Sequence, residues 1–389
     1  MAWTTPVDGD VYASPLIVAG HVIVATENNT VYSLDLFSGA VVWMAHLGDA
    51  VDGSSLPCGN IKPLTGITGT PAADRSVGRL YVVAFLRGYQ HVLFTLSLDD
   101  GSIIAQQGVD PAGSDPRVQQ ERGALALGSG FVYVPLGGLF GDCGTYHGYV
   151  VAVPRASGGP VLTYRTPATR EAGIWNPQGT TVAESGAVYV VTGNGSSRST
   201  FDYSNSVIEL SAELQVQSYF APTNWISLNA TDTDLGSVGA TLLPSMGVVV
   251  AIGKQGVAYL LRASQLGGIG GQIAALSVCS GAWGGTAWSG STVFLPCADA
   301  LVALSVTSTS ISVAWRAAHP RLGSPIVAAG AVWAIEPAAA TLYALDPSSG
   351  AVAQSFNLGA SRQFSTPAAT DGFIVAPAGT KVVAISTSA

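Results

Sequence analysis

Residues 31–43, VYSLDLFSGAVVW, have the pattern of two strands joined by a tight turn. Apolar and β-branched residues dominate both sides of the turn, as expected for a half-buried β-hairpin. Asp35, Gly39 and Trp43 follow one another at intervals of four residues. A carboxylate caps such a turn, a glycine supplies a positive φ angle, and a tryptophan packs flat on a neighbouring unit. The pattern therefore predicts a hairpin that docks on another like it.

The hairpin recurs in degraded form along the chain. The further copies are FTLSLDDGSIIA (94–105), VVAVPRASGGPVLTY (150–164), VIELSAELQVQSY (207–219), YLLRASQLGG (259–268), VALSVTSTSISVAW (302–315) and LYALDPSSGAVAQSF (342–356). Strand pairs that begin at a small residue, often before Pro, start at eight places: Ser14, Thr70, Gly123, Gly179, Gly239, Gly285, Ser324 and Thr366. Such self-similarity is the signature of a repeat architecture.

The eighth repeat, FSTPAATDGFIVAPAGTKVVAIST (364–387), stops after its third strand. MAWTTPV (1–7) is similar to VVWMAHLG (41–48), the end of the first hairpin, so we expect it to supply the missing strand. Closure of this kind covers sheet edges. The sequence thus predicts an all-β, eight-bladed β-propeller of four-stranded blades, closed by the N-terminal strand. The expected single domain, 1–389, has blades at about 8–49, 67–110, 120–167, 173–222, 235–277, 282–319, 321–361 and 362–387 plus 1–7.

Composition limits the function classes. The 389 residues are 48% hydrophobic and only 10% charged, which is enough for a large core. The net charge of −8 and the lack of any Lys/Arg cluster argue against nucleic acid as a partner. Apolar runs such as SMGVVVAIG (245–253) are shorter than the roughly 20 residues of a membrane helix. We therefore expect no membrane span and a monomer, and MAWTTPVDGD (1–10) lacks the pattern of a signal peptide.

The segment SLDLFSGAVVW (33–43) resembles the tryptophan-docking repeat of quinoprotein propellers, the PQQ-like repeat family. The resemblance extends over nearly the whole chain and implies the propeller fold. It also implies two kinds of function. One is that of PQQ-dependent alcohol or polyvinyl-alcohol dehydrogenases, and the other, more distantly, is that of the non-catalytic propellers of outer-membrane assembly lipoproteins. The choice between them has to be argued from a site.

Polar residues gather just before the first strand or just after the second strand of the third to fifth repeats, where loops emerge on one face. They are Arg122, Asp142, Trp175, Asn194, Asp232, Asp234 and Lys254. Oxygen ligands from Asp and Asn suit a hard cation such as Ca²⁺. Arg and Lys hold a polyanionic ligand, and Trp gives a planar ring a flat floor. A further Asp acts as general base towards an alcohol.

The sequence around these residues resembles that of PQQ-dependent alcohol dehydrogenases, in the same order. The matching segments are RGAL (122–125), GDCGTYHGYVVAV (141–153), GIWNPQG (173–179), VYVVTGNG (188–195), DTDLGSVGATLL (232–243) and GKQGVAYLL (253–261). The resemblance implies cofactor-binding roles for Arg122, Trp175 and Lys254. It implies metal ligation by Asp142 and Asn194, and a catalytic role for Asp232, which we prefer to Asp234.

The sequence departs from those dehydrogenases in three respects. VQQERG (118–123) stands where they have two adjacent cysteines whose disulfide stacks on the quinone. Asp142 replaces their acidic Glu ligand, in a longer loop. No Cys-x-x-Cys-His is present, so no c-type haem is expected and electrons would pass to an external acceptor.

Two hypotheses therefore stay open. In the first, the protein is a PQQ- and Ca²⁺-dependent dehydrogenase of a small-molecule alcohol. In the second, it is a binding or scaffold propeller with a protein partner and a vestigial cofactor funnel. Convergence of Arg122, Asp142, Asn194, Asp232 and Lys254 on one cavity above Trp175, with room for a tricyclic ring, favours the first. If Lys254 instead pairs with Asp232 and fills the funnel, the dehydrogenase hypothesis fails.

Most of the candidate residues also have a purely structural explanation. Arg122 and Asp142 are compatible with an ion pair between blades. Asn194 is compatible with a turn, Trp175 with core packing, and Asp232 and Asp234 with a loop cap. Lys254 is the hardest to explain this way, because nothing near it in sequence needs its charge.

The four cysteines, Cys58, Cys143, Cys279 and Cys297, lack zinc-ligand spacing. Cys279 precedes a first strand and Cys297 ends the following second strand, positions that lie side by side in a hairpin. Cys58 and Cys143 fall on the same face of neighbouring blades and are candidates for a second bridge. Disulfides predict an extracellular or periplasmic location, and buried free thiols are the alternative.

Overall fold

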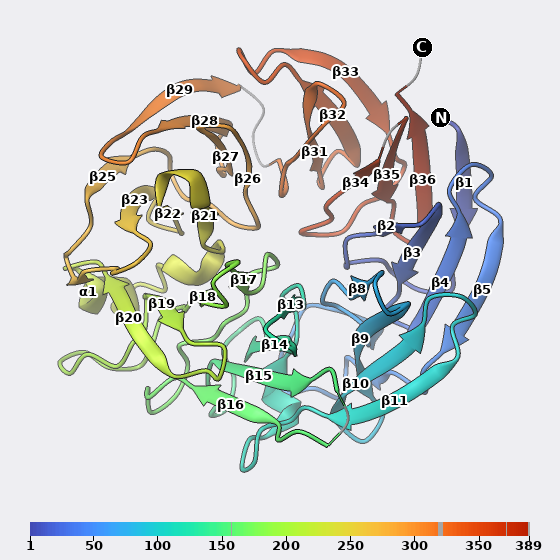
Figure 1. Cartoon of the computed structure of the whole chain (residues 1–389), viewed down its shortest axis with the longest axis horizontal. Coiled ribbons are helices and arrows are strands. Elements are labelled where there is room, and N and C mark those ends of the chain that lie inside the picture. The colour runs from blue at the N-terminus through green and yellow to red at the C-terminus, as the bar shows by residue number, and fades with distance from the viewer. Residues whose placement is uncertain (157, 318–321, 371, 388–389) are drawn as a thin grey trace. The chain divides into compact units, whose positions relative to one another are not determined.

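The computed structural model describes residues 1–156, 158–317, 322–370 and 372–387. It is nearly all β, and its fold class is the predicted eight-bladed β-propeller of four-stranded blades (Figure 1). The chain divides into two compact units, residues 1–110 with 321–389 and residues 111–320. Each unit holds four blades. The expected boundary between the sixth and seventh blades, at 319–321, lies outside the described residues.

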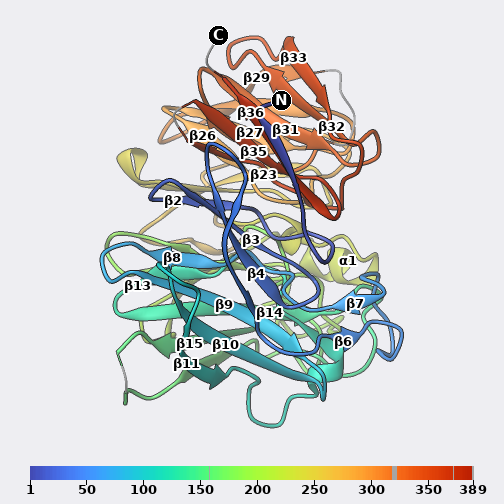
Figure 2. The same cartoon turned by 90° about the vertical axis from the view of Figure 1, so that its right-hand side faces the viewer.

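The first unit contains the two N-terminal and the two C-terminal blades. The strands, from the inner to the outer one of each blade, are β2 (Leu16–Val18), β3 (His21–Ala25), β4 (Thr30–Asp35), β5 (Val41–His46); β8 (Ala72–Asp74), β9 (Arg79–Leu86), β10 (Gln90–Ser97), β11 (Ile103–Gly108); β30 (Ile326–Ala328), β31 (Ala331–Glu336), β32 (Thr341–Leu345), β33 (Val352–Asn357); and β34 (Ala368–Thr370), β35 (Phe373–Pro377), β36 (Lys381–Ser386), β1 (Trp3–Pro6). A two-stranded ribbon of β6 (Val51–Asp52) and β7 (Leu64–Thr65) is inserted between the first two blades. Figure 2 shows β8 to β11 side by side in this order.

The N-terminal strand completes the last blade, as predicted. β1 pairs antiparallel with β36, with Trp3 opposite Ala384, and the two strands lie next to each other in Figure 1. The sheet order is β1-β36-β35-β34, so the first residues of the chain become the outer strand of a blade built from its last residues.

Tryptophan docking joins successive blades of this unit. Asp35 Oδ1 accepts hydrogen bonds from the backbone N–H groups of Phe37 and Ser38 at 3.2 and 2.8 Å, which caps the turn. Gly39 then adopts φ +70°, and a Cβ placed there would lie 2.6 Å from the Trp3 ring. The Trp3 indole N–H donates to the Leu36 carbonyl at 2.8 Å. The ring of the preceding blade therefore lies flat on the glycine of the next.

The same contact recurs one blade further on and gives the first prediction. A Cβ at Gly101, which has φ +72°, would lie 2.5 Å from Trp43. We expect Gly101→Ala to lower the free energy of unfolding by about 2–4 kcal/mol, because it adds both strain and a clash. Gly78 has φ +63° and no neighbour within 4 Å, so Gly78→Ala should cost only about 1 kcal/mol. Urea unfolding followed by tryptophan fluorescence measures both, and equal losses would contradict the docking role.

The second unit contains the four central blades. Their strands, from inner to outer, are β13 (Ala126–Gly128), β14 (Phe131–Gly138), β15 (Tyr149–Pro154), β16 (Leu162–Arg165); β17 (Thr181–Val182), β18 (Val188–Val191), β19 (Val207–Leu210), β20 (Val216–Ala221); β21 (Thr241–Leu243), β22 (Val248–Ala251), β23 (Val257–Arg262), β25 (Ala274–Ser277); and β26 (Ala287–Ser289), β27 (Thr292–Pro296), β28 (Leu301–Val306), β29 (Ile311–Ala317). β12 (Gln119–Gln120) adds to the outer part of β14. The helices are α1 (Trp225–Ala230) and single 3₁₀ turns at Pro116–Val118, Leu235–Ser237 and Pro244–Met246.

One strand departs from the expected pattern. The sequence predicted that 259–268 would form a hairpin within its own blade. Instead, β24 (Gly268–Ile269) pairs in parallel with β20 of the preceding blade, and β25 becomes the outer strand. Glycines at 267, 268 and 270 have φ angles of 98°, 71° and 73°, which turn the chain out of the hairpin.

Apolar side chains fill the space between neighbouring blades. Val250 and Leu260 of the fifth blade share a buried cluster with Leu295 and Val302 of the sixth. This packing holds the strands and leaves their connecting loops to carry polar groups. Among the described residues, no helix combines the length and the hydropathy of a membrane span.

Candidate functional site

Lys254 makes ion pairs with two carboxylates of the second unit. Its Nζ lies 2.6 Å from Asp234 Oδ2 and 2.9 Å from Asp232 Oδ1. The side chains of Lys254 and Asp234 are 18% and 3% exposed, whereas that of Asp232 is 63% exposed. The arrangement is therefore a buried Lys254–Asp234 pair with Asp232 on its solvent side.

Gly253 and Gly256, at the two ends of the turn between β22 and β23, allow this geometry. A Cβ at Gly253 would lie 2.3 Å from the carbonyl oxygen of Asp234, so only glycine lets the two segments approach. The Lys254 N–H donates to that same carbonyl at 2.8 Å. On the other side, the Asn194 N–H donates to Asp234 Oδ1 at 2.5 Å. The sequence GKQG therefore places the lysine against a carboxylate that the backbone also holds.

Trp175 borders the ion pair. Lys254 Nζ lies 5.8 Å from the centroid of its ring, within the range of a cation–π contact. A Cβ at Gly193 would lie 2.9 Å from Asp234 Oδ1 and 3.0 Å from Trp175 Nε1, so this glycine separates the two side chains narrowly. Trp175 is only partly buried. Part of its side chain is therefore exposed to solvent.

A second pair of carboxylates lies in the loops next to Asn194. Tyr146 donates its hydroxyl hydrogen to Asp142 Oδ1. Arg170 Nη2 lies 2.8 Å from Glu171 Oε1 and donates to the Asp142 carbonyl at 2.9 Å. Backbone pairing between Glu171 and Gly195 connects this group to the Asn194 segment.

The backbone of these acidic residues is strained. Asp142, Glu171 and Asp232 have φ angles of 51°, 70° and 50°, in a left-handed region that such residues seldom adopt. Strain of this kind persists only where the surroundings enforce it, and it concentrates at ligand sites. The loops are therefore held in a defined arrangement.

Burial and mutual repulsion shape the electrostatics. Burial raises the pKa of Glu171, and the carboxylates of Asp142 and Asp234 add to this rise. Burial likewise raises the pKa of Asp234, although the Lys254 charge opposes it. For Lys254, burial lowers the pKa, but the carboxylates of Asp234 and Asp232 outweigh it and raise the pKa above its ordinary value.

Acidic side chains outnumber basic ones in these loops. In the described contacts, four carboxylates face two cationic side chains, Arg170 and Lys254, and Arg198 adds a more distant positive charge. The Asn194 side-chain amide takes part in none of the hydrogen bonds described for this part of the chain. A surplus of negative charge and a set of oxygen-only donors are what Ca²⁺ requires.

A family model matches the N-terminal part of the chain. Residues 1–192, a little under half of the 389, match the model described as outer membrane protein assembly factor BamB. No curated protein sequence matches the chain.

Solved structures similar to this chain include enzymes and an assembly factor. Quinohemoprotein alcohol dehydrogenase ADHIIG from Pseudomonas putida HK5 has a TM-score of 0.77 and 14% identity, covering 98% of this chain and 75% of its own. A europium-containing methanol dehydrogenase has 0.76 and 14%, covering 97% and 85%. BamB from Moraxella catarrhalis has 0.66 and 11%, covering 98% of both chains. At these identities the likeness shows the fold alone.

The propeller brings most of the predicted site residues together. Lys254, Asp232, Asp234, Asn194 and Trp175 form one connected group. Lys254 does pair with Asp232, the contact that the sequence analysis associated with a non-catalytic propeller when it also fills the funnel.

Among the described hydrogen bonds, Asp142 accepts from Tyr146 and Arg170, and not from Lys254 or its partners. Tyr146, Arg170 and Glu171 were not predicted. The sequence TREAGIW (169–175) carried a signal, because two adjacent charged residues lie just before the candidate Trp175 in a chain with few charges. Arg122 lies outside the contacts described above and is buried, with 8% exposure.

The cysteines are oxidised. A disulfide joins Cys279 and Cys297, the pair expected from their places in one hairpin. Cys58 and Cys143 are also in the disulfide form. The described cysteines therefore include no free thiol.

Proposed function

We propose that this propeller binds a divalent cation and PQQ beside Lys254 and oxidises an alcohol. The observation that carries the proposal is the buried Lys254–Asp234 pair beside the partly exposed Trp175. A buried ion pair is costly to maintain unless further interactions compensate. Perturbed titratable groups that gather beside an aromatic face are characteristic of functional sites.

The residues divide into two binding sets. Asp142, Glu171 and Asn194 would hold the cation through oxygen atoms. Lys254 and Arg122 would hold the carboxylates and carbonyl oxygens of PQQ, and Trp175 would lie against its rings. When bound, the cofactor supplies a two-electron acceptor whose carbonyl the cation polarises.

Asp234 suits the role of general base better than Asp232, the residue that the sequence favoured. Its carboxylate is buried and fixed by Lys254 Nζ and the Asn194 N–H. Burial raises its pKa above the ordinary value, which makes the carboxylate a stronger base towards an alcohol. Lys254 keeps its positive charge and stabilises negative charge that develops on an oxygen nearby. Asp232, exposed to solvent, would receive the proton from this pair and pass it to water.

Because the sequence has no Cys-x-x-Cys-His motif for a c-type haem, an external acceptor would take the electrons. The disulfides fit an extracellular or periplasmic location for this exchange.

A non-catalytic binding or scaffold propeller is the second candidate. The observation that favours it is the Lys254–Asp232 contact, which engages the lysine with an exposed carboxylate. The match of residues 1–192 to the BamB family model points the same way. A protein partner would then replace the alcohol as the ligand.

Calorimetric titration of PQQ into metal-stripped protein, with and without CaCl₂, separates the two candidates. We expect binding that depends on Ca²⁺. Lys254→Ala should weaken it by about 10- to 100-fold, because a charge-assisted hydrogen bond is lost. Asn194→Ala should raise the Ca²⁺ concentration required and leave the melting temperature unchanged, since its amide has no described hydrogen bond to lose.

Lys381→Ala serves as the control, because Lys381 is exposed in the other unit. It should bind as the unaltered protein does. Heats equal to dilution in every titration of folded protein would reject the enzyme proposal and leave the binding propeller. An artificial electron acceptor and a panel of primary alcohols then test turnover.

A further inference from the structure

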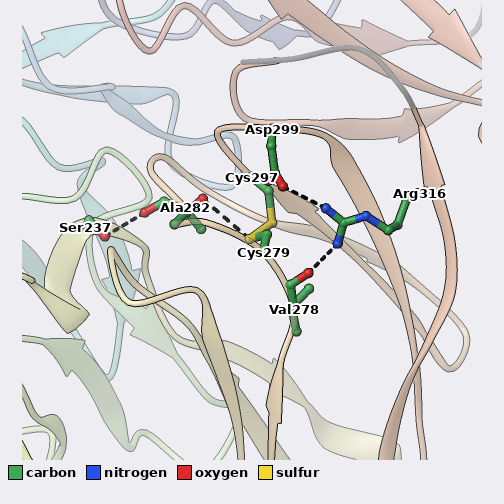
Figure 3. Close-up of a disulfide and its surroundings, with 8 residues drawn as sticks. Ser237, Val278, Cys279, Ala282, Cys297, Asp299 and Arg316 are labelled. Atoms are coloured by element: carbon green, nitrogen blue, oxygen red, sulfur yellow. Dashed lines mark hydrogen bonds and ion pairs between the residues drawn. A yellow bond between two sulfur atoms is a disulfide. The ribbon is translucent and has the colours of Figure 1, made fainter.

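The Cys279–Cys297 disulfide lies beside the β22–β23 turn, which carries Lys254. Cys279 belongs to residues 278–282, which we call the clamp segment, and Cys297 directly follows β27. Ala282 and Cys297 form an antiparallel bridge, and the Ala298 N–H donates to the Gly281 carbonyl at 2.8 Å. The disulfide adds a covalent link to this short contact, with a sequence separation of 18 (Figure 3).

The clamp segment makes hydrogen bonds at both ends of the turn that carries Lys254. The N–H groups of Val278 and Cys279 donate to the Gly256 carbonyl at 2.8 and 3.2 Å, and the Ala282 N–H donates to the Gly253 carbonyl at 3.1 Å. Both ends of the four-residue GKQG turn are therefore held by one segment.

The approach of the two backbones is too close for side chains. A Cβ at Gly256 would lie 1.8 Å from the carbonyl oxygen of Cys279, and one at Gly281 would lie 2.8 Å from the carbonyl oxygen of Lys254. Because the two backbones are closely packed, a shift of the clamp segment displaces the hairpin as well.

The clamp segment also contacts the other partner of the ion pair. Ser237 Oγ donates to the Ala282 carbonyl at 2.7 Å and to the Asp234 carbonyl at 3.2 Å. Figure 3 shows Ser237 and Ala282 on one side of the disulfide and Arg316 on the other. One segment thus touches the backbone on both sides of the Lys254–Asp234 pair.

Arg316 of β29 braces the outer side. Its guanidinium donates to the Val278 carbonyl and, at 2.9 Å, to Asp299 Oδ2. Asp299 follows Cys297 by two residues, so this bridge crosses the same two segments as the disulfide. The Arg316 and Asp299 side chains are 40% and 44% exposed, so solvent screens their ion pair and the covalent link is the firmer tie.

We propose that the Cys279–Cys297 disulfide is a positioning element that fixes the Lys254 hairpin against Asp234 and Trp175. The disulfide holds the lysine in place, and this effect is separate from any increase in the free energy of unfolding. The inference rests on the proposed function only for its consequence in cofactor binding. The placement of Lys254 is testable without the cofactor.

Lysine acylation measures this placement directly. The chain has three lysines, Lys62, Lys254 and Lys381, and the first and last are exposed. Mass spectrometry after brief treatment with N-acetoxysuccinimide gives the labelling rate of each. In the double variant Cys279→Ala/Cys297→Ala we expect Lys254 to react about tenfold faster, because local opening becomes easier. Lys62 and Lys381 should react as before.

A matched variant separates positioning from stability. Ile208 is fully buried in the fourth blade, in a different core cluster from Val278. Ile208→Ala lowers the melting temperature without touching the clamp segment, and Lys254 should then react at the original rate. Equal Lys254 rates in the double variant and the unaltered protein would overturn the proposal, whatever the melting temperature.

Cofactor titration adds the link to function. If PQQ binds with Ca²⁺, the double variant should bind it about tenfold more weakly, with Ile208→Ala unchanged. If PQQ does not bind the unaltered protein, the proposed function fails, while the acylation rates still decide the role of the disulfide.

Discussion

Deletion of residues 1–7 is expected to unfold the unit made of residues 1–110 and 321–389. The deletion removes β1, so β36 loses its four paired residues and becomes an exposed edge. It also removes Trp3, which is 9% exposed and lies on Gly39. Loss of a buried tryptophan alone costs about 3–5 kcal/mol. That is comparable to the whole stability of a typical domain, about 5–15 kcal/mol.

Thermal melting and light scattering of the deletion variant measure this effect. We expect a lost or strongly lowered transition for this unit and aggregation through the open edge. Thr4→Ala in the same strand is the control, since Thr4 is exposed and its side chain should contribute little. A synthetic peptide of residues 1–7 should restore part of the transition. A deletion variant that melts with the full chain would show that β36 does not need its partner.

The sequence predicts the blades because their signal is local and repeated. Asp35, Gly39 and Trp43 lie within one hairpin, and each contacts either its own turn or a neighbouring blade. The closing strand is predictable because it copies the end of another repeat. β24 and α1 are not predictable in this way. β24 depends on several nearby glycines with positive φ angles, and α1 is a short helix within a loop.

The site is predicted less completely, because its contacts join residues far apart in sequence. Order along the chain indicates which loops matter. It does not indicate that Tyr146 caps Asp142 or that Arg170 connects Glu171 to that loop.

The segment DTD illustrates the limit. Both aspartates have the same chemistry and lie two residues apart, so sequence does not show which one is buried. The positive φ of Asp232 directs its side chain to solvent and leaves the buried position to Asp234.

Replacement of Lys254 by Met should destabilise the second unit strongly at neutral pH. The variant leaves the Asp234 carboxylate buried with no ammonium beside it. Removal of one partner from a buried ion pair costs about 3–5 kcal/mol. Urea unfolding in EDTA-treated buffer at pH 8 measures the loss without interference from bound cations.

The cost should depend on pH in a defined direction. Burial raises the pKa of Asp234 above the ordinary 3.8, and loss of the Lys254 charge raises it further. A group with a raised pKa in the folded state destabilises the fold once pH exceeds its unfolded pKa. The penalty of Lys254→Met therefore grows from about pH 4 up to the folded pKa and is constant above it. As the pH falls towards and below the ordinary 3.8, the raised pKa lets Asp234 take up a proton in the folded state, so the variant should approach the unaltered protein.

A double variant tests whether the buried charge is the cause. Asp234→Asn removes the carboxylate and keeps a side chain of similar size, so Lys254→Met/Asp234→Asn should be more stable at pH 8 than Lys254→Met alone. The recovery should shrink as the pH is lowered towards 3.8, because protonation of Asp234 removes the charge that the second substitution removes. Asp232→Asn is the matched control, since Asp232 is 63% exposed and needs no counter-charge to remain in water. If Asp232→Asn rescues Lys254→Met as well as Asp234→Asn does, the destabilising charge is not the buried one. The assignment of Asp234 as the base would then lose its physical basis.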